Sequence, residues 1–220
     1  MTSKNTLIIG TRGSALALAQ ADMVRAALSA LHPGLDIRRE IIRTTGDRRM
    51  DVPLADVARV SGIVDKGIFI KELETALLEG RIDVAVHSLK DVPSELAPEF
   101  RLPAVLPRAA AEDVLITKEP DWNGRGTLAT GSVRRRLMAR TYWGRQLRFE
   151  DLRGNVPTRL EKLVEHPEWD AVILAKAGLE RLGLYAPETV VQGRKLYMRP
   201  LPVEAFIPAV GQGIVGMECR

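Results

Sequence analysis

The sequence predicts an α/β fold arranged as two domains, and three observations support this prediction. Short apolar runs alternate with longer amphipathic segments over residues 6–89 and again over 126–183. Such alternation is typical of βαβ units. A proline-interrupted stretch, 101–108, separates the two series. The chain has 220 residues, enough for two domains of about 100 residues each.

The first series begins with a strand at 6–10 and a helix at 14–31, for which Ser14 is the expected N-cap. A strand at 36–42, a helix at 68–80 that stops at Gly80, and a strand at 81–89 follow. The faces expected to be buried are Leu16, Ala19, Met23, Ala27 and Leu31 in the first helix and Ile70, Leu73 and Leu77 in the second.

The stretch 101–108 is predicted to be a crossover without regular structure, because it contains two prolines. The second series then has strands at 126–131, 146–152 and 170–175. Its helices are expected at 132–144, with Ser132 as N-cap, at 156–166, with Pro157 in the first turn, and at 177–183. The buried face of the middle helix should comprise Val156, Leu160, Leu163 and Val164.

This order of elements predicts parallel sheets with helices on both faces. The tail after Pro202 is expected to cross back to the first domain. The predicted domains are therefore 1–105 plus 204–220, and 106–203.

Composition excludes several classes of protein. No run of about 18 apolar residues is present, so no transmembrane helix is expected. The N-terminus lacks the features of a signal peptide, and a single cysteine, Cys219, permits no intrachain disulfide. These features favour the cytoplasm. The three histidines are scattered, which argues against a metal site.

Polar clusters follow four of the predicted strands. They are Arg12 with Ser14; Ser88, Lys90 and Asp91; Thr130, Gly131 and Ser132; and Arg153. In open parallel sheets, ligands bind outside the carboxyl ends of the strands. All four clusters are therefore expected to face a common cleft between the domains.

The chemistry of these clusters favours an anionic ligand. Two of them lead into helix N-termini, which attract anions, and the arginines at 134, 135, 153 and 159 carry forks that suit carboxylates or phosphates. Asp91 is a carboxylate among cations, so it is expected to be ionised and to stabilise a developing cation or relay a proton. Nucleic acid and a small polycarboxylate both remain open from these residues alone.

Simpler interpretations apply to each motif taken singly. Lys90 and Asp91 can be an exposed loop, the three arginines at 134–136 a solvated helix face, and "TGS" an ordinary N-cap. His87 lies inside an apolar strand and is expected to be a packed core residue. Cys219 is expected to be a structural thiol.

The order of motifs resembles one known family. "GTRGSALALAQ", "HSLKDVP", "ATGSVRRR", "LRGNVPTRLEKL" and "PAVGQGIVGMECR" are similar to segments of porphobilinogen deaminase, or hydroxymethylbilane synthase, and the resemblance covers nearly the whole chain. It implies head-to-tail joining of four porphobilinogen molecules into hydroxymethylbilane, with release of ammonia, in tetrapyrrole biosynthesis. It also implies a monomer with two domains like type II periplasmic binding proteins, a ligand cleft between them, and a dipyrromethane cofactor joined to a cysteine.

The resemblance also implies roles for individual residues. Asp91 matches the catalytic aspartate, which assists the loss of ammonia, and the adjacent Lys90 is expected to be catalytic with it. Contacts to the carboxylates of cofactor and substrate are implied for Arg12, Ser14, Ser88, Lys90, Thr130, Ser132, Arg134, Arg135, Arg153, Arg159 and Arg181. Lys66 and Phe69 match a loop beside the cleft, and Gln20 and Gln212 match residues lining it.

The sequence departs from the family at its end. The family continues into a third domain that carries the cofactor-bearing cysteine, and the 220 residues, which end at "MECR", are not expected to include that domain. Cys219 matches a different cysteine, so no anchoring cysteine is expected in this chain. The loop around 54–66 is longer than usual.

Two functions follow: an enzyme, or a pyrrole-carboxylate binding module that is inactive without the third domain. Nucleic-acid binding is disfavoured because no motif for it is present, and no membrane partner is expected.

Overall fold

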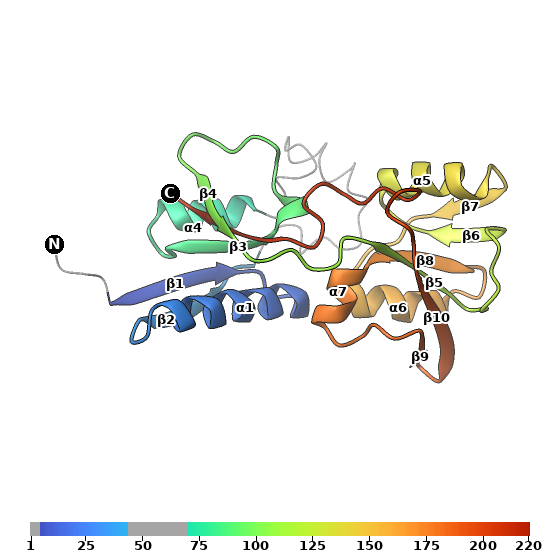
Figure 1. Ribbon diagram of the computed structural model, residues 1–220, viewed down its shortest axis with the longest axis horizontal. Coiled ribbons are helices and arrows are strands. Elements are labelled where there is room, and N and C mark those ends of the chain that lie inside the picture. The colour runs from blue at the N-terminus through green and yellow to red at the C-terminus, as the bar shows by residue number, and fades with distance from the viewer. Residues whose placement is uncertain (1–4, 44–69) are drawn as a thin grey trace. The chain divides into compact units, whose positions relative to one another are not determined.

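The computed structural model describes residues 5–43 and 70–220, which form two compact units (Figure 1). Unit 1 comprises Met1–Arg108 and Ile214–Arg220, and unit 2 comprises Ala109–Gly213. Each contains one β-sheet with helices packed on it, so the predicted α/β fold class with two domains is confirmed. None of the helices in the described ranges is long and apolar enough to cross a membrane.

Unit 1 has a five-stranded sheet in the order β2-β1-β3-β11-β4. The strands are β1 (Thr6–Thr11), β2 (Asp36–Ile41), β3 (Val84–Ser88), β4 (Arg101–Val105) and β11 (Val215–Cys219). The helices are α1 (Ala15–Leu31), α4 (Lys71–Leu78) and the 3-10 turn η2 (Leu89–Asp91). Ser14 caps α1 by accepting from Ala17 N at 3.3 Å, and Gly80 has φ of +70°, which confirms the predicted start of α1 and stop of α4.

Alternate residues of the central strands separate two cores in unit 1. Ile9 and Val86 pack with α1 through Val24. Ala85 packs on the other face with α4 through Leu73 and Leu77. Helices therefore cover both faces of the sheet, as predicted.

The predicted buried face of α1 is wrong. Met23 and Leu31 are 39% and 74% exposed. The residues of α1 that are buried are Gln20, Ala21 and Val24. The apolar residues of α1 itself lie on several sides of the helix, so their periodicity alone does not select a buried face. A polar contact contributes to its orientation, because the Gln20 amide donates to Ser88 Oγ at 2.8 Å.

Unit 2 has a six-stranded sheet in the order β7-β6-β8-β5-β10-β9. The strands are β5 (Asp113–Thr117), β6 (Gly126–Ala129), β7 (Leu147–Glu150), β8 (Ala171–Ala175), β9 (Glu188–Val191) and β10 (Arg194–Pro200). The helices are α5 (Val133–Trp143), α6 (Val156–Glu165) and α7 (Lys176–Arg181). One face packs on α6 and α7 through Leu160, Leu163 and Leu179, and the other packs on α5 through Ala139.

Both sheets are mixed, which corrects the prediction of purely parallel sheets. In unit 1, β11 runs antiparallel to β3, and in unit 2, β5 runs antiparallel to β8. These are the strands that immediately follow the two points where the chain changes unit. No helix precedes either strand at these points in the described ranges, so the expected alternation of strands and helices did not indicate their antiparallel direction. The strands at 113–117, 188–191 and 194–200 were not predicted from the sequence.

The stretch 101–108 is not free of regular structure, because β4 forms from Arg101 to Val105 and pairs antiparallel with β11. Pro103 lies within β4. This strand is at the edge of the sheet, where a missing N–H need not break a ladder on both sides. The proline therefore permits an edge strand here.

The second crossing lies later than the predicted boundary at 203/204. Residues 204–213 belong to unit 2. Phe206 is fully buried in the core that includes Leu115 and Leu128. Gln212 is also fully buried and donates to Ala111 O at 2.7 Å. These contacts hold the segment to unit 2 beyond Pro202.

A buried histidine–glutamate pair in unit 1 interacts electrostatically with the partly buried Glu74. His87 is 5% exposed, and its Nε2 lies 2.8 Å from Oε2 of the fully buried Glu218, so the prediction of a packed core histidine is confirmed. Burial raises the pKa of Glu74, repulsion by Glu218 raises it further, and His87 opposes both. Glu74 is therefore harder to ionise in the folded protein than in the unfolded chain.

Replacing Glu74 by glutamine is expected to stabilise unit 1 at pH 7.5. A carboxyl whose pKa is raised by folding binds its proton more tightly in the folded state, so the stability it contributes is lost as pH rises through the folded pKa. The gain from Glu74→Gln should shrink as pH falls and vanish below the ordinary value of 4.5. Urea unfolding followed by circular dichroism at pH 7.5 and pH 4 measures it. Glu95→Gln, at an exposed position, is the control, and a pH-independent difference would contradict the account.

Candidate functional site

Two of the predicted clusters lie at the same edge of the sheet in unit 1. Strands β1 and β3 are parallel neighbours, so their carboxyl ends are adjacent. Arg12 and Ser14 follow β1, and Ser88 ends β3. The Gln20–Ser88 hydrogen bond joins α1 to the end of β3. The structure thus brings these four predicted residues to one edge of unit 1.

Lys90 and Asp91 lie in η2, directly after β3. The backbone of this turn is fixed, since Leu89 N donates to Ile214 O at 3.0 Å and Val92 N donates to Leu89 O at 3.1 Å. Asp91 is half-buried, and within residues 5–43 and 70–220 its carboxylate has no hydrogen bond or ion pair. A carboxylate on a fixed turn without a protein partner is suited to meet a cationic group of a ligand.

The unit 2 clusters also share one edge. Strands β6 and β7 are parallel neighbours, and they lead into Thr130–Ser132 and Arg153 respectively. Because β5 is antiparallel, its first residue, Asp113, lies at this same edge opposite Ala175, the last residue of β8. The carboxyl ends of three strands therefore meet the start of a fourth.

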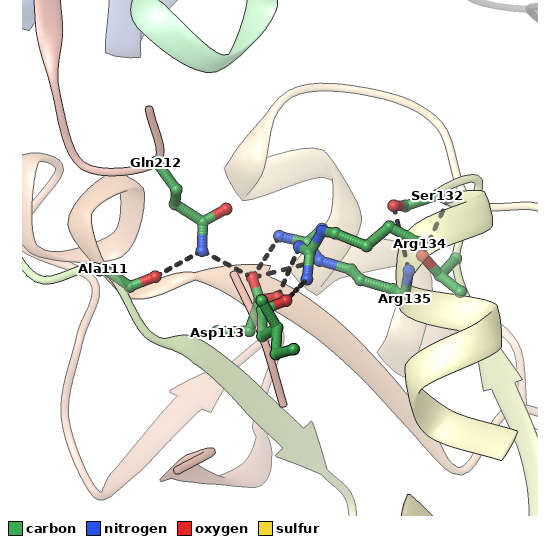
Figure 2. Close-up of polar contacts among 8 residues, drawn as sticks. Ala111, Asp113, Ser132, Arg134, Arg135 and Gln212 are labelled. Atoms are coloured by element: carbon green, nitrogen blue, oxygen red, sulfur yellow. Dashed lines mark hydrogen bonds and ion pairs between the residues drawn. The ribbon is translucent and has the colours of Figure 1, made fainter. Parts of the chain in front are cut away.

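Asp113 is the centre of a buried polar cluster in unit 2 (Figure 2). Arg134 Nη2 donates to its Oδ2 at 2.6 Å, and Arg135 Nη2 donates to its Oδ1 at 2.7 Å. Gln212 Nε2 also donates to Oδ1, at 3.1 Å. Ser132 caps α5 by accepting from Arg135 N at 3.3 Å, which confirms its predicted local role.

The cluster carries a net positive charge. Burial alone would raise the pKa of Asp113, but the ion pairs with Arg135 and Arg134 outweigh it and hold that pKa below its ordinary value. Asp113 is therefore ionised at neutral pH. One carboxylate then balances two guanidinium groups, and one positive charge is left at this edge of the sheet.

All three consecutive arginines have carboxylate partners in the protein. Arg136 Nε donates to Thr130 O at 3.0 Å, and its Nη2 is hydrogen-bonded to Asp151 Oδ1. Arg135 is 6% exposed, so it does not belong to a solvated helix face. Cations at a helix N-terminus oppose the helix dipole, and Asp113 and Asp151 offset that repulsion. Asp113 was not among the predicted site residues, because its only local signal is an aspartate that opens the apolar run "DVLIT".

Two of the other predicted arginines of unit 2, Arg153 and Arg181, keep donors that no residue in the described ranges satisfies. Arg153 is half-buried and has no hydrogen bond or ion pair to any residue in the described ranges. Arg159 Nε donates to Gly154 O at 2.7 Å. Arg181 Nη2 donates to Gly213 O at 2.7 Å, but its Nε is buried without a partner among the described residues. Burial lowers the pKa of Arg181, and a bound carboxylate would compensate that desolvation.

The structure groups the predicted site residues by unit. Arg12, Ser14, Gln20, Ser88, Lys90 and Asp91 belong to unit 1, and Thr130, Ser132, Arg134, Arg135, Arg153, Arg159, Arg181 and Gln212 belong to unit 2. Lys66 and Phe69, and the loop at 54–66, lie outside the described residues. The cleft shared by both groups stays a prediction.

Comparison with known proteins identifies related sequences. The family whose sequence model matches residues 7–220 is described as "porphobilinogen deaminase, dipyromethane cofactor binding domain". The porphobilinogen deaminase of Syntrophotalea carbinolica is 44% identical over 99% of this chain and 65% of its own length. That of Roseiflexus castenholzii is 44% identical over 99% of this chain and 67% of its own length. The chain thus spans about two thirds of these relatives.

Solved structures share the fold at low sequence identity. A Pseudomonas aeruginosa protein described as a LysR family transcriptional regulator has a TM-score of 0.52 and 13% identity over 97% of this chain and 64% of its own. The effector-binding domain of BenM, solved with its effector benzoate, has a TM-score of 0.51 and 14% identity over 98% of this chain and 83% of its own. At such identities the likeness concerns the fold alone.

Proposed function

The chain belongs to the porphobilinogen deaminase family, and we propose from this premise that it binds porphobilinogen and takes part in tetrapyrrole biosynthesis as a hydroxymethylbilane synthase. The proposed reaction joins four porphobilinogen molecules head to tail, and one water then breaks the bond to the cofactor ring and supplies the hydroxyl of the terminal hydroxymethyl group. In each addition, a carbon–carbon bond forms between the aminomethyl carbon of one molecule and a free ring carbon of the next. The aminomethyl carbon–nitrogen bond breaks, and the displaced ring proton balances release of the amine as ammonium.

The observation that carries this proposal is that two arginines of unit 2, Arg153 and Arg181, have donors without a partner among the described residues. Arg153 has no partner in the described part of the chain, and Arg181 keeps a buried Nε without one. Porphobilinogen carries two carboxylates, and a guanidinium pairs with a carboxylate through two parallel hydrogen bonds. Arginines in this state are therefore suited to the carboxylates of a pyrrole.

The same residues suit a dipyrromethane cofactor. The arginines at 134, 135, 153, 159 and 181 would hold its carboxylates, with Thr130 and Ser132 beside them. When bound, the cofactor supplies the pyrrole ring to which the first substrate is joined. Cys219, the single cysteine of the sequence, is the last residue of β11 and lies in register with Arg101 of β4. We propose that this chain holds the cofactor without a thioether to Cys219.

Charge separation explains why a carboxylate is needed as well as arginines. As the amine leaves, positive charge develops on the reacting carbon and its ring nitrogen. Asp91, on its fixed turn, would face that charge and accept a hydrogen bond from the ring N–H. The adjacent Lys90 would meet a substrate carboxylate. We expect the protein to act as a cytoplasmic monomer without nucleic-acid or membrane partners.

Incubation of the purified chain with porphobilinogen tests the proposal. Ammonia release and formation of bilane, detected as uroporphyrin after acid oxidation, are the expected results for an enzyme. Binding without ammonia release would support the alternative, in which this chain is a pyrrole-carboxylate binding module. The intact mass should remain that of the unmodified chain, and an added dipyrromethane mass would overturn the proposed non-covalent attachment. If the chain neither binds porphobilinogen nor turns it over, both functions are contradicted.

A further inference from the structure

Asp113 is the one acidic residue at the centre of the cluster in Figure 2, and none of the motifs in the sequence marks it. We infer that Asp113 is a positioning residue, which orients Arg134 and Arg135 before a ligand arrives and thereby sets the affinity of unit 2 for pyrrole carboxylates. This inference rests on the proposed function, because that function supplies the ligand.

The geometry of helix α5 explains why such a residue is needed. Consecutive residues of an α-helix project in directions about 100° apart and do not face each other. Two like charges in the first turn also repel each other and the helix dipole. Asp113 overcomes both effects, since its Oδ2 binds Arg134 and its Oδ1 binds Arg135. The two guanidinium groups therefore converge on one carboxylate.

Other contacts fix the clamp itself. Asp113 is fully buried at the start of β5, and Gln212 links its Oδ1 to Ala111 O. Arg134 Nη1 donates to Ile207 O at 2.5 Å. The carboxylate and one of its two arginines are thus tied to the backbone of two separate segments. The Asp113 carboxylate and the Arg134 guanidinium would each lose hydrogen bonds on turning toward another partner.

The clamp leaves donors for a ligand. A guanidinium has five N–H groups. The interactions of Arg134 use Nη1 and Nη2, and those of Arg135 use Nε and Nη2. Nε of Arg134 and Nη1 of Arg135 have no hydrogen bond to any residue in the ranges that the structure describes. The cluster therefore keeps a net positive charge together with oriented, unused donors.

Replacing Asp113 by asparagine separates positioning from simple charge balance, because the two predict opposite signs. The substitution adds one positive charge at the edge of the sheet. If Asp113 were only a counter-charge, carboxylate ligands would bind more tightly to the variant. If Asp113 positions the arginines, the variant loses their convergence and binds more weakly despite its higher charge.

Calorimetric titration with porphobilinogen compares the unsubstituted chain, Asp113→Asn and Asp151→Asn. Asp151 pairs with the neighbouring Arg136 and its side chain is 65% exposed, so it is a matched control for the same chemical change. We expect Asp113→Asn to weaken binding by about tenfold or more, and Asp151→Asn to change it by less than about twofold. Equal or tighter binding by Asp113→Asn overturns the inference. Absence of binding by the unsubstituted chain would instead overturn the proposed function.

The Asp113 variant leaves Arg135 buried without a full partner and can fail to fold. A second measurement therefore uses neither this variant nor a ligand. Side-chain nitrogen NMR of the unsubstituted chain reports rotation of each guanidinium group, with signals assigned through Arg134→Lys and Arg135→Lys. We expect restricted rotation for Arg134 and Arg135 without ligand, and free rotation for the exposed Arg125. Free rotation of Arg134 and Arg135 would overturn the inference whatever the chain binds.

Discussion

Asp91→Asn is expected to slow the release of ammonia from porphobilinogen by about 100- to 1,000-fold, the range for loss of one electrostatic contact to a transition state. The substitution keeps the size of the side chain and removes its negative charge. Because Asp91 has no hydrogen bond or ion pair within the described ranges, the fold does not depend on that charge. Affinity for porphobilinogen should change by less than about threefold, since the arginines remain.

The matched control for this prediction is Asp36→Asn. Asp36 begins β2, at the amino ends of the parallel strands of the same sheet, and pairs with the exposed Arg38. Asp91 follows the carboxyl end of β3. Substitution of Asp36 should leave ammonia release unchanged. A rate for Asp91→Asn equal to that of Asp36→Asn would show that the carboxylate at the end of β3 takes no part in the reaction. If Asp91→Asn instead lowers the affinity for porphobilinogen by as much as it lowers the rate, the role of Asp91 is in binding.

Phe206→Ala is expected to lower the free energy of unfolding of unit 2 by about 3–5 kcal/mol, because it removes a fully buried aromatic side chain and leaves a cavity. The Phe206 ring lies 6.0 Å from Trp143 and 6.3 Å from Tyr142, between ring centroids. The three tryptophans of the sequence are Trp122, Trp143 and Trp169, all in unit 2. Urea unfolding followed by tryptophan fluorescence therefore reports on this unit.

The neighbouring residue supplies the control. Ile207 is 58% exposed, so Ile207→Ala should change the free energy of unfolding by less than about 0.5 kcal/mol. If the two variants unfold alike, residues 204–213 do not pack in unit 2, and the second crossing between units lies nearer the boundary expected from the sequence.

The predictions that rest on local chemistry were confirmed. Ser14 and Ser132 cap their helices, Gly80 ends α4 with a positive φ, and Leu160 and Leu163 are buried on one face of α6. Each of these depends on residues within one or two turns of the chain. Composition and spacing are sufficient for such features, because the competing conformations are also local.

The features that the sequence did not reveal depend on contacts between distant residues. Asp113 meets Arg134 and Arg135 across 21 and 22 residues, so nothing near it in the sequence indicates its partners. The orientation of α1 depends in part on Gln20 reaching Ser88 across 68 residues. Pro103 was interpreted as a break, but its strand is at an edge of the sheet. Tertiary placement decided each of these cases.

The most direct test of the central claim is a calorimetric titration of porphobilinogen into the unsubstituted chain and into Arg153→Gln. The claim is that Arg153 and Arg181, whose donors are not all satisfied by the described residues, bind pyrrole carboxylates. It predicts saturable binding to the unsubstituted chain that weakens by at least about tenfold in Arg153→Gln, because one charge-assisted pair is lost. Equal affinity of the two proteins, or no binding to either, would contradict it.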